Sequence, residues 1–340
     1  MTATHLAWRR GGLSLRVHRR TVLACLGLGG ALLLAAVLSL YLGDYPLSLA
    51  QVWEGLRGEG EGAFVVATLR APRLLAGACA GACLGLSGAI FQSLARNPLA
   101  APDVIGFTQG AGLGAVAVIA FTDLGGAWVT LGAVGGGLAA AVLVGALAWK
   151  GGLRVWRLVL VGLGVGYALY AGIDFAMTRS DRFGATAATQ WLAGSLNARL
   201  WSHVAIAAGG LAVLAPLALD CERGLDRLEM GDDAAVALGV RVGALRLGAV
   251  TVAVLLCAVA VSVAGPIAFV AFVAGPLGRR IAGASGAGLL PAALTGATLL
   301  VGADLAARTA FAPTQLPAGL FTAAIGAPYL LWLLVRQSAR

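Results

Sequence analysis

Residues that could do covalent chemistry are few in this chain, and none has the spacing that common mechanisms need. The only lysine, Lys150, follows Trp149 and precedes Gly151, so the chain lacks the Gly-Lys-Ser/Thr ending of a phosphate-binding loop. The three histidines are scattered and lack the spacing of a zinc protease or a haem site. Asp232 and Asp233 form a lone acidic pair, which is too little for a prenyl-diphosphate metal site. The sequence therefore does not favour an enzyme, and any ATP-driven activity needs an ATPase on a separate polypeptide.

Two acidic residues lie within apolar segments, where proton- or ion-driven transporters bury their ionisable groups. Asp174 and Asp304 both lie toward the outer ends of their segments, and Arg308 follows Asp304 by one helical turn. A local ion pair between Asp304 and Arg308 is the favoured interpretation. The apolar segments otherwise lack charge, so an ion-coupled mechanism has few groups to use.

The segment Leu69–Gly106 carries polar residues that membrane crossing alone does not explain. Arg70 and Arg73 stand around a proline, an apolar run punctuated by glycine follows, and residues 96–98 form the polar break Arg-Asn-Pro. A membrane helix accounts for the apolar run, because about 20 residues with internally bonded backbone cross the hydrocarbon core. The polar break is not needed for crossing, and we expect function there.

The composition indicates that a polytopic membrane bundle positions these residues. Of the 340 residues, 59% are hydrophobic and 11% are charged, whereas a typical soluble protein carries about 25% charged residues. The net charge of +9 is spread over the ends of apolar runs, which indicates membrane topology and not a nucleic-acid surface. Cys79 and Cys83 lie within an apolar run and are interpreted as buried small hydrophobic residues, not as a metal site or a disulfide.

Ten apolar runs predict an all-α fold with ten transmembrane helices in one compact bundle. The break at Gly265-Pro266 divides the uncharged stretch Leu247–Gly278 into two helices, because this stretch is too long for one span. Glycines four residues apart, at 77, 81 and 85 and again at 106, 110 and 114, predict close helix packing. The predicted spans lie near residues 21–42, 72–91, 104–122, 127–149, 157–177, 200–219, 245–264, 267–284, 289–309 and 316–335.

The distribution of positive charge predicts that both termini are cytoplasmic. With the N-terminus inside, seventeen of the 24 arginine and lysine residues face the cytoplasm and seven face outside, as the positive-inside rule expects. The predicted organisation is a cytoplasmic segment at residues 1–20, a membrane domain at 21–335 and a cytoplasmic C-terminus at 336–340. The uncharged run Thr21–Leu42 is too long for a signal-peptide core, so we interpret it as an uncleaved first helix.

The longest charged stretch, residues 220–246, lies on the cytoplasmic side between the sixth and seventh predicted spans. Asp232 and Asp233 follow Gly231, so they can cap a short helix through its free backbone N–H groups. Two short helices around a glycine are more than a connector needs. The stretch is therefore interpreted as a docking surface, with a plain connector as the alternative.

Seven segments, taken in order, resemble the FecCD-type permeases of ABC importers, which take up iron–siderophore complexes, haem and cobalamin. The resemblance covers nearly the whole chain from the first span onward, and the ten predicted spans agree with it. The segments are LRAPRLLAGACAGACLGLSGAIFQSLARNPLAAPDVIGFTQGAGLGA (69–115), LVLVGLGVG (158–166), QWLAGSLNARLW (190–201), LEMGDDAAVALGV (228–240), AGPIAFVAFVAG (264–275), LLVGADLAAR (299–308) and LPAGLFTAAIGAPYLLWLL (316–334).

The resemblance implies a multi-pass protein of the inner (cytoplasmic) membrane that works as part of an assembly. Two ten-helix permeases, which are two copies or two paralogues, form a dimer on cytoplasmic ABC ATPases. A substrate-binding protein delivers the substrate from outside. ATP and Mg²⁺ bind to the partner ATPase, and the chain itself holds no cofactor or metal. Its surroundings are membrane lipids, and no nucleic acid is expected as a partner.

The resemblance also assigns roles to residues at both ends of the bundle. Outer arginines resemble those that pair with acidic residues of the binding protein, with lipid-headgroup anchoring as the alternative. These are Arg70, Arg73 and Arg308. The Asn-Pro-Leu break resembles the cytoplasmic gate beneath the pathway, and its members are Asn97, Pro98 and Leu99. The segment that resembles the ATPase-coupling helices has the matching residues Gly231, Asp232, Asp233, Ala235, Leu238 and Gly239.

Two departures from the family pattern limit what carries over. Gly275-Pro276 stands where many members have Pro-His, so no role of that histidine transfers. The loop Leu153–Arg157 lacks the small hydroxyl residues that form a second gate in some members.

The stretch GSLNAR at residues 194–199 is most similar to siderophore permeases, which favours an iron–siderophore complex as the substrate. Cobalamin and haem are the alternatives within the family, and an ion-coupled secondary transporter is the alternative from another class. The sequence does not identify the siderophore or the residues that contact it.

Overall fold

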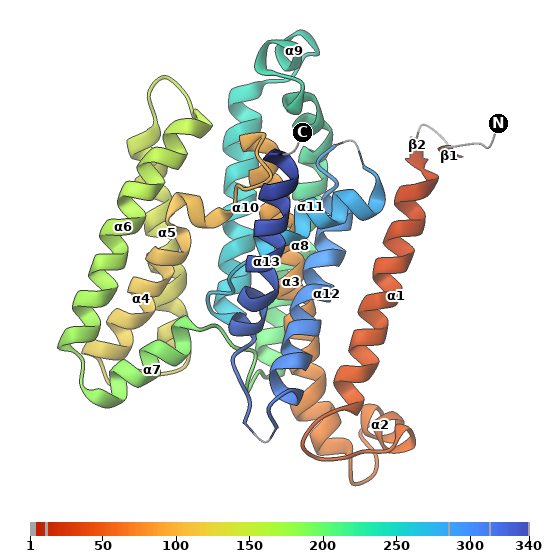
Figure 1. Cartoon of the computed structure of the whole chain (residues 1–340), viewed down its shortest axis with the longest axis vertical. Helices are drawn as coiled ribbons and strands as arrows, with labels where there is room; N and C mark the ends of the chain where they lie inside the picture. The colour runs from red at the N-terminus through yellow and green to blue at the C-terminus, as the bar shows by residue number, and fades with distance from the viewer. Residues whose placement is uncertain (1–4, 11–12, 285, 313, 339–340) are drawn as a thin grey trace.

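The computed structural model describes residues 5–10, 13–284, 286–312 and 314–338, which form a helical bundle preceded by one short hairpin (Figure 1). The hairpin pairs β1 (His5–Arg10) antiparallel with β2 (Leu13–His18), and it lies to one side of the bundle at the start of α1 (Arg19–Tyr41). The all-α prediction is confirmed for the bundle and did not include this hairpin.

Each predicted apolar run coincides with a helix. These helices are α1, α3 (Ala71–Ala95), α4 (Phe107–Phe121), α5 (Ala127–Ala148), α6 (Val155–Arg179), α8 (Trp201–Glu229), α10 (Val242–Ala264), α11 (Val270–Ala282), α12 (Leu289–Thr309) and α13 (Ala318–Ser338). Within the described ranges, seven of them are long and apolar enough to cross a membrane, and the exceptions are α4, α11 and α13. Short elements between them are α2 (Leu49–Leu56), the π-helical η1 (Phe64–Arg70), the 3₁₀ turn η2 (Pro102–Ile105), α7 (Arg182–Leu192) and α9 (Asp232–Ala237).

The predicted break after the seventh run is confirmed. α10 ends at Ala264, and Gly265 follows with a φ of 70°, a value that glycine adopts without steric cost. Phe269 is also left-handed, with a φ of 66°, immediately before α11 begins. The chain therefore leaves one helix and enters another within five residues.

The prediction of two short helices in residues 220–246 was wrong. The first ten of these residues continue α8, which is 29 residues long, and only α9 is a separate short helix. At 1.5 Å per residue, α8 is about 43 Å long, which exceeds the ~30 Å hydrocarbon core. Its last turns and α9 therefore extend beyond the other helices at one end of the bundle (Figure 1).

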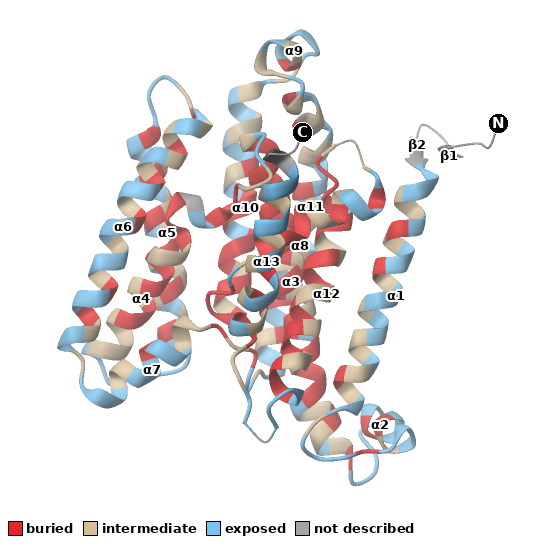
Figure 2. Ribbon diagram, in the orientation of Figure 1, coloured by how far each residue is buried: buried red, intermediate tan, exposed pale blue. Residues whose placement is uncertain are grey.

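α3 lies at the centre of the bundle and packs against α8, α10, α11 and α12. In its most apolar window 78% of the residues are buried, compared with 11% for α1, which lies at the edge (Figure 2). The apolar run of the segment Leu69–Gly106 therefore forms the central helix of the fold.

Glycines set how closely α3 approaches α12. A Cβ atom on Gly85 would lie 2.2 Å from the carbonyl oxygen of Ala292, and one on Gly81 would lie 2.4 Å from that of Gly296. Both distances are too short for any side chain, so the two backbones are in direct contact. The prediction that these glycines serve close packing is confirmed.

A second group of helices, α4 to α7, lies beside the α3-centred group (Figure 1). Within it, α4 meets α5 through glycine as well: a Cβ on Gly114 would lie 2.0 Å from the carbonyl oxygen of Gly132. The two groups join through η2 and through contacts between α5 and α10.

Candidate functional site

The glycine contact between α3 and α12 fixes which polar residues meet at the end of the bundle near α2. From Gly85 opposite Ala292, twelve residues back along α3 and twelve forward along α12 lead to Arg73 and Asp304. These two side chains form a salt bridge of 2.8 Å between Nη2 and Oδ1. The packing of small residues in the core therefore determines the position of this ion pair.

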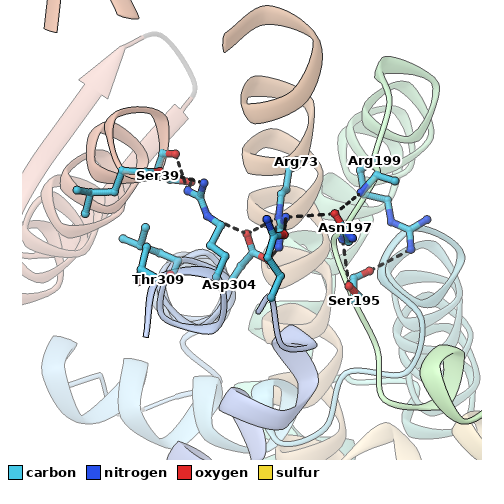
Figure 3. A network of polar contacts seen from close by, with 12 residues as sticks. Ser39, Arg73, Ser195, Asn197, Arg199, Asp304 and Thr309 are labelled. Atoms are coloured by element: carbon cyan, nitrogen blue, oxygen red, sulfur yellow. Dashed lines mark hydrogen bonds and ion pairs between the residues drawn. The ribbon is translucent and has the colours of Figure 1, made fainter. Parts of the chain in front are cut away.

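Arg73 holds the buried carboxylate of Asp304 through two of its nitrogens (Figure 3). Its Nε donates to both carboxylate oxygens, at 2.9 and 3.1 Å, in addition to the Nη2 contact. Bidentate contacts of this kind are among the strongest hydrogen bonds in proteins. The second terminal nitrogen, Nη1, reaches outward to Gln315 at 3.1 Å and Asn197 at 3.5 Å. The pair thus connects α3, α12 and the loops on either side.

Arg70 and Arg308 both hold the C-terminal end of α1. Arg70 donates to the carbonyl oxygens of Leu40 at 2.7 Å and of Tyr41 at 3.0 Å. Arg308 donates to the Ser39 hydroxyl at 2.7 Å and to the Leu42 carbonyl at 3.1 Å. The last carbonyls of a helix have no intrahelical partner and carry partial negative charge, so two cations stabilise them. The sequence analysis missed this role, because the arginines come from η1 and α12.

The guanidinium groups of the three predicted docking arginines therefore already have partners within the chain. Arg70 and Arg308 are each 6% exposed, and the side chain of Arg73 is 11% exposed. Beside them lies a cavity of about 400 Å³ that Asp44 and Arg199 also line. Contact with a binding protein stays a prediction for all three arginines.

The predicted pair between Asp304 and Arg308 is present but is not the main contact. Arg308 Nε lies 3.9 Å from Asp304 Oδ2, whereas Arg73 lies within 2.8 Å. The other acidic residue considered, Asp174, lies exposed on α6. In the described part of the chain, no group of three or more His, Cys, Asp or Glu side chains could hold a metal ion.

At the opposite end of the bundle, near α9, the Asn-Pro-Leu break forms a tight turn. α3 ends at Ala95, the C-cap residue Arg96 has a left-handed φ of 50°, and the next residue is Asn97. The Asn97 side-chain oxygen accepts from the backbone N–H of Leu99 at 2.9 Å, which is a turn typical of asparagine. Asn97 is exposed, while Pro98 and Leu99 are half-buried. The gate role predicted for these three residues is not tested by this geometry.

The predicted coupling segment begins at Gly231, whose φ of 121° starts α9. The prediction that Asp232 and Asp233 cap this helix is wrong, because Gly231 is the N-cap residue and no side-chain cap hydrogen bond is present. Asp233 also lies in the first turn of α9. Ala235 is buried, Gly239 ends the segment with a φ of 80°, and apolar side chains are exposed around it. The exposed apolar residues are Met230, Val236 and Leu238.

Asp232 instead connects the coupling segment to the end of α3. Its carboxylate accepts two bonds of 2.8 Å from Arg246 on α10 and forms a further ion pair with Arg96. Arg96 also donates to the Leu228 carbonyl of α8 at 2.9 Å. Partial burial acts to raise the pKa of Asp232, but the hydrogen bonds and charges of Arg246 and Arg96 outweigh it and leave the pKa lowered. Asp232 and Arg96 therefore link α9 to the residue that directly precedes the Asn-Pro-Leu turn.

The sequence gives little indication of this connection: Arg96 precedes the turn, but it lies far from Asp232 along the chain. Thr108 and Gln109 lie half-buried at the start of α4, and Tyr167 and Tyr170 lie exposed on α6.

The model of the FecCD transport family matches residues 31–336 of this chain. The chain is 42% identical over 328 residues to the ferric enterobactin transport system permease protein FepG of Escherichia coli (strain K12), covering 95% of this chain and 99% of FepG. It is 38% identical to the achromobactin transport system permease protein CbrC of Dickeya dadantii (strain 3937), covering 98% and 97%. It is 35% identical to the hemin transport system permease protein HmuU of Yersinia pestis, covering 91% and 95%.

The fold is similar to that of a solved structure described as a metal-chelate type ABC transporter in an inward-facing conformation. The TM-score is 0.81 at 28% sequence identity, with 93% of this chain and 99% of that chain covered. Sequence and fold thus agree along nearly the whole length, and the chain belongs to the FecCD transport family.

Proposed function

We propose that this chain is the permease subunit of an ABC importer that moves iron–siderophore complexes across the cytoplasmic membrane. The observation that carries the proposal is the full-length similarity to FepG and CbrC, whose names state ferric enterobactin and achromobactin transport. The chain lacks a phosphate-binding loop, so ATP and Mg²⁺ bind to a separate ATPase. Haem is the second candidate, because HmuU is also similar over most of its length.

The proposed topology has ten spans and cytoplasmic termini. The start of α1, the end of α13 and α9 all lie at the same end of the bundle (Figure 1). That end also carries the predicted cytoplasmic arginines of α8 and α10, which agrees with the positive-inside rule. In this topology α4 and α11 cross with fewer residues than the other helices.

The α9 end is the proposed ATPase-docking surface. Met230, Val236 and Leu238 present apolar side chains around α9, and an exposed apolar patch of this kind suits a protein partner. Nucleotide-driven movement of the ATPase would displace α9, and Asp232 would transmit it through Arg96 to the turn at residues 97–99. The permease then changes between outward-open and inward-open states as a rigid-body transition that ATP binding biases.

The α2 end is the proposed docking surface for the substrate-binding protein. Arg73 is the most exposed of the three arginines there, and Gln315 and Asn197 lie beside it at the rim of the cavity. Arg70 and Arg308 support this surface by fixing the end of α1. The second permease of the dimer is either another copy of this chain or a paralogue.

Co-purification tests this function directly. The tagged chain, extracted in mild detergent from its own cells, should bring down an ATPase subunit. An Asp233→Arg change combined with Leu238→Arg on the α9 surface should abolish that association, and Asp174→Asn on α6 should leave it intact. If no ATPase is recovered under several extraction conditions, the ABC importer function is wrong. If the α9 variant keeps its association with the ATPase and only Asp174→Asn loses uptake, the ion-coupled alternative is favoured.

A further inference from the structure

An apolar groove of about 400 Å³ lies between α5 and α10, where the α4–α7 group meets the rest of the bundle. Its volume falls within the ~300–1,000 Å³ typical of ligand pockets. Val142 on one wall and Leu255 on the other are exposed in the chain. Gly145 carries no side chain, and the space that a Cβ atom would occupy there is empty, with no other atom within 4 Å. The groove is thus an open apolar space on a face that lies within the membrane.

The groove offers no free hydroxyl group to a ligand. Thr251 carries the only hydroxyl among its lining residues, and it donates to the carbonyl oxygen of Leu247 on its own helix at 2.8 Å. The remaining walls are aliphatic except for the indole of Trp149 at one end. An apolar chain, and not a polar solute, therefore suits this space.

The end of the groove near Trp149 is closed by a basic loop that contains no acidic residue. Leu153 lines the groove from within this loop, while Lys150 and Arg154 are exposed beside it. Arg157 donates to the Lys150 carbonyl at 3.2 Å and stacks on the Trp156 ring at 5.2 Å, which holds the loop together. Trp149 and Trp156 are exposed, and tryptophan is enriched where membrane proteins meet lipid headgroups.

We propose that this groove binds an anionic phospholipid, with an acyl chain between α5 and α10 and its phosphate beside Lys150 and Arg154. Lipid tails gain no hydrophobic transfer energy by leaving other tails, so retention depends on fit and on headgroup charge. Cations near a membrane surface attract anionic lipid by ~1 kcal/mol each, which corresponds to about fivefold in affinity per residue. A second copy of this chain, which also carries +9, would bring positive charge to the same loop.

Lipid titration of the purified chain in detergent, followed by native mass spectrometry, tests this site. The probes are phosphatidylglycerol and phosphatidylcholine with identical acyl chains. We expect phosphatidylglycerol to bind more tightly than phosphatidylcholine. The double change Lys150→Gln/Arg154→Gln should lower the affinity for phosphatidylglycerol by about fivefold per cation, which removes most of that preference. Gly145→Trp should weaken both lipids, because the indole occupies the groove. The matched controls, Gly27→Trp on α1 and Arg223→Gln on α8, should bind both lipids as the unchanged protein does.

Two results would overturn the proposal. One is a preference for phosphatidylglycerol that survives the change of Lys150 and Arg154, which would place the anionic lipid elsewhere. The other is a Gly145→Trp protein that binds lipid normally and shifts from dimer to monomer, which would show that a second copy covers the groove. Lys150 and Arg154 have exposed side chains, so replacing them should not disturb folding. The test therefore remains valid even if Gly145→Trp fails to fold.

Discussion

Replacing Arg73 with methionine tests whether the Arg73–Asp304 pair stabilises the contact between α3 and α12. The side chains are only 11% and 4% exposed, so the pair is largely shielded from water. Without Arg73, Asp304 keeps the longer 3.9 Å contact to Arg308. Removing one partner of a buried ion pair costs about 3–5 kcal/mol, and we expect about 3 kcal/mol because Arg308 remains.

This free energy corresponds to a measurable change in thermal stability. At ~2.1 cal/mol/K of unfolding entropy per residue, the chain has about 0.7 kcal/mol/K in total, so Tm should fall by about 4 °C. Tryptophan fluorescence of the purified chain during heating measures this change. Arg57→Met is the matched control, because Arg57 is an exposed arginine at the same end of the bundle.

A double change separates the pair from its members. Arg73→Met together with Asp304→Leu removes both charges, and replacing a whole buried pair with apolar residues is often neutral. The double variant should therefore regain most of the lost stability, which a double-mutant cycle measures. The reasoning is refuted if Arg73→Met lowers Tm no more than Arg57→Met, or if the two changes are simply additive.

The α9 connection, the α3–α12 contact and the exposed acid of α6 each give a further prediction. Arg96→Gln should reduce ATP-driven uptake by about fivefold or more, because fivefold is the lower limit of typical coupling between two sites. The subunits should still co-purify. Because the pKa of Asp232 is lowered, the connection persists at all pH values above the ordinary ~3.9 and is lost only below it, so coupling should not vary between about pH 5 and 8. Gly85→Ala should destabilise the chain by about 1–3 kcal/mol, since its Cβ would lie 2.2 Å from the Ala292 oxygen. Asp174→Asn should leave uptake unchanged.

Each of these predictions has a control and a contradicting result. Gly27→Ala on α1 has open space at the Cβ and should not lower Tm. If Gly85→Ala lowers Tm no more than Gly27→Ala does, the packing argument is contradicted. Arg182→Gln, which changes an exposed arginine of α7, is the control for Arg96→Gln in the uptake assay. Normal uptake by the Arg96 variant, or a loss of coupling between about pH 5 and 8, would show that Asp232 does not transmit movement.

Hydropathy and glycine spacing were sufficient to predict where the ten apolar helices lie. Both signals are local: an apolar run identifies a membrane helix, and small residues four apart identify a contact face. The break at Gly265-Pro266 was predicted for the same reason, because proline cannot continue a helical hydrogen-bond ladder. The length of α8 was not predicted, because the charged residues of its last turns look like a loop in the sequence and the contacts that hold them in a helix are not visible there.

The polar contacts between helices could not be predicted, because they depend on register. Arg73 lies 231 residues before Asp304, and only the alignment of Gly85 with Ala292 brings the two together. Arg308 was therefore assigned to Asp304 from its position one turn away, although its stronger contacts are with the end of α1. In the same way, Asp232 looked like a helix cap until α3 and α10 brought Arg96 and Arg246 to it.

ATP-driven uptake into proteoliposomes tests the central claim most directly. The chain and its co-purified partners are reconstituted with ATP inside, and the binding protein loaded with a radioactive iron–siderophore complex that it binds is added outside. We predict that iron accumulates with ATP, does not accumulate with ADP, and is unaffected by a protonophore. Accumulation that needs no ATP and collapses when the proton gradient is removed would contradict the assignment of this chain as an ABC importer permease.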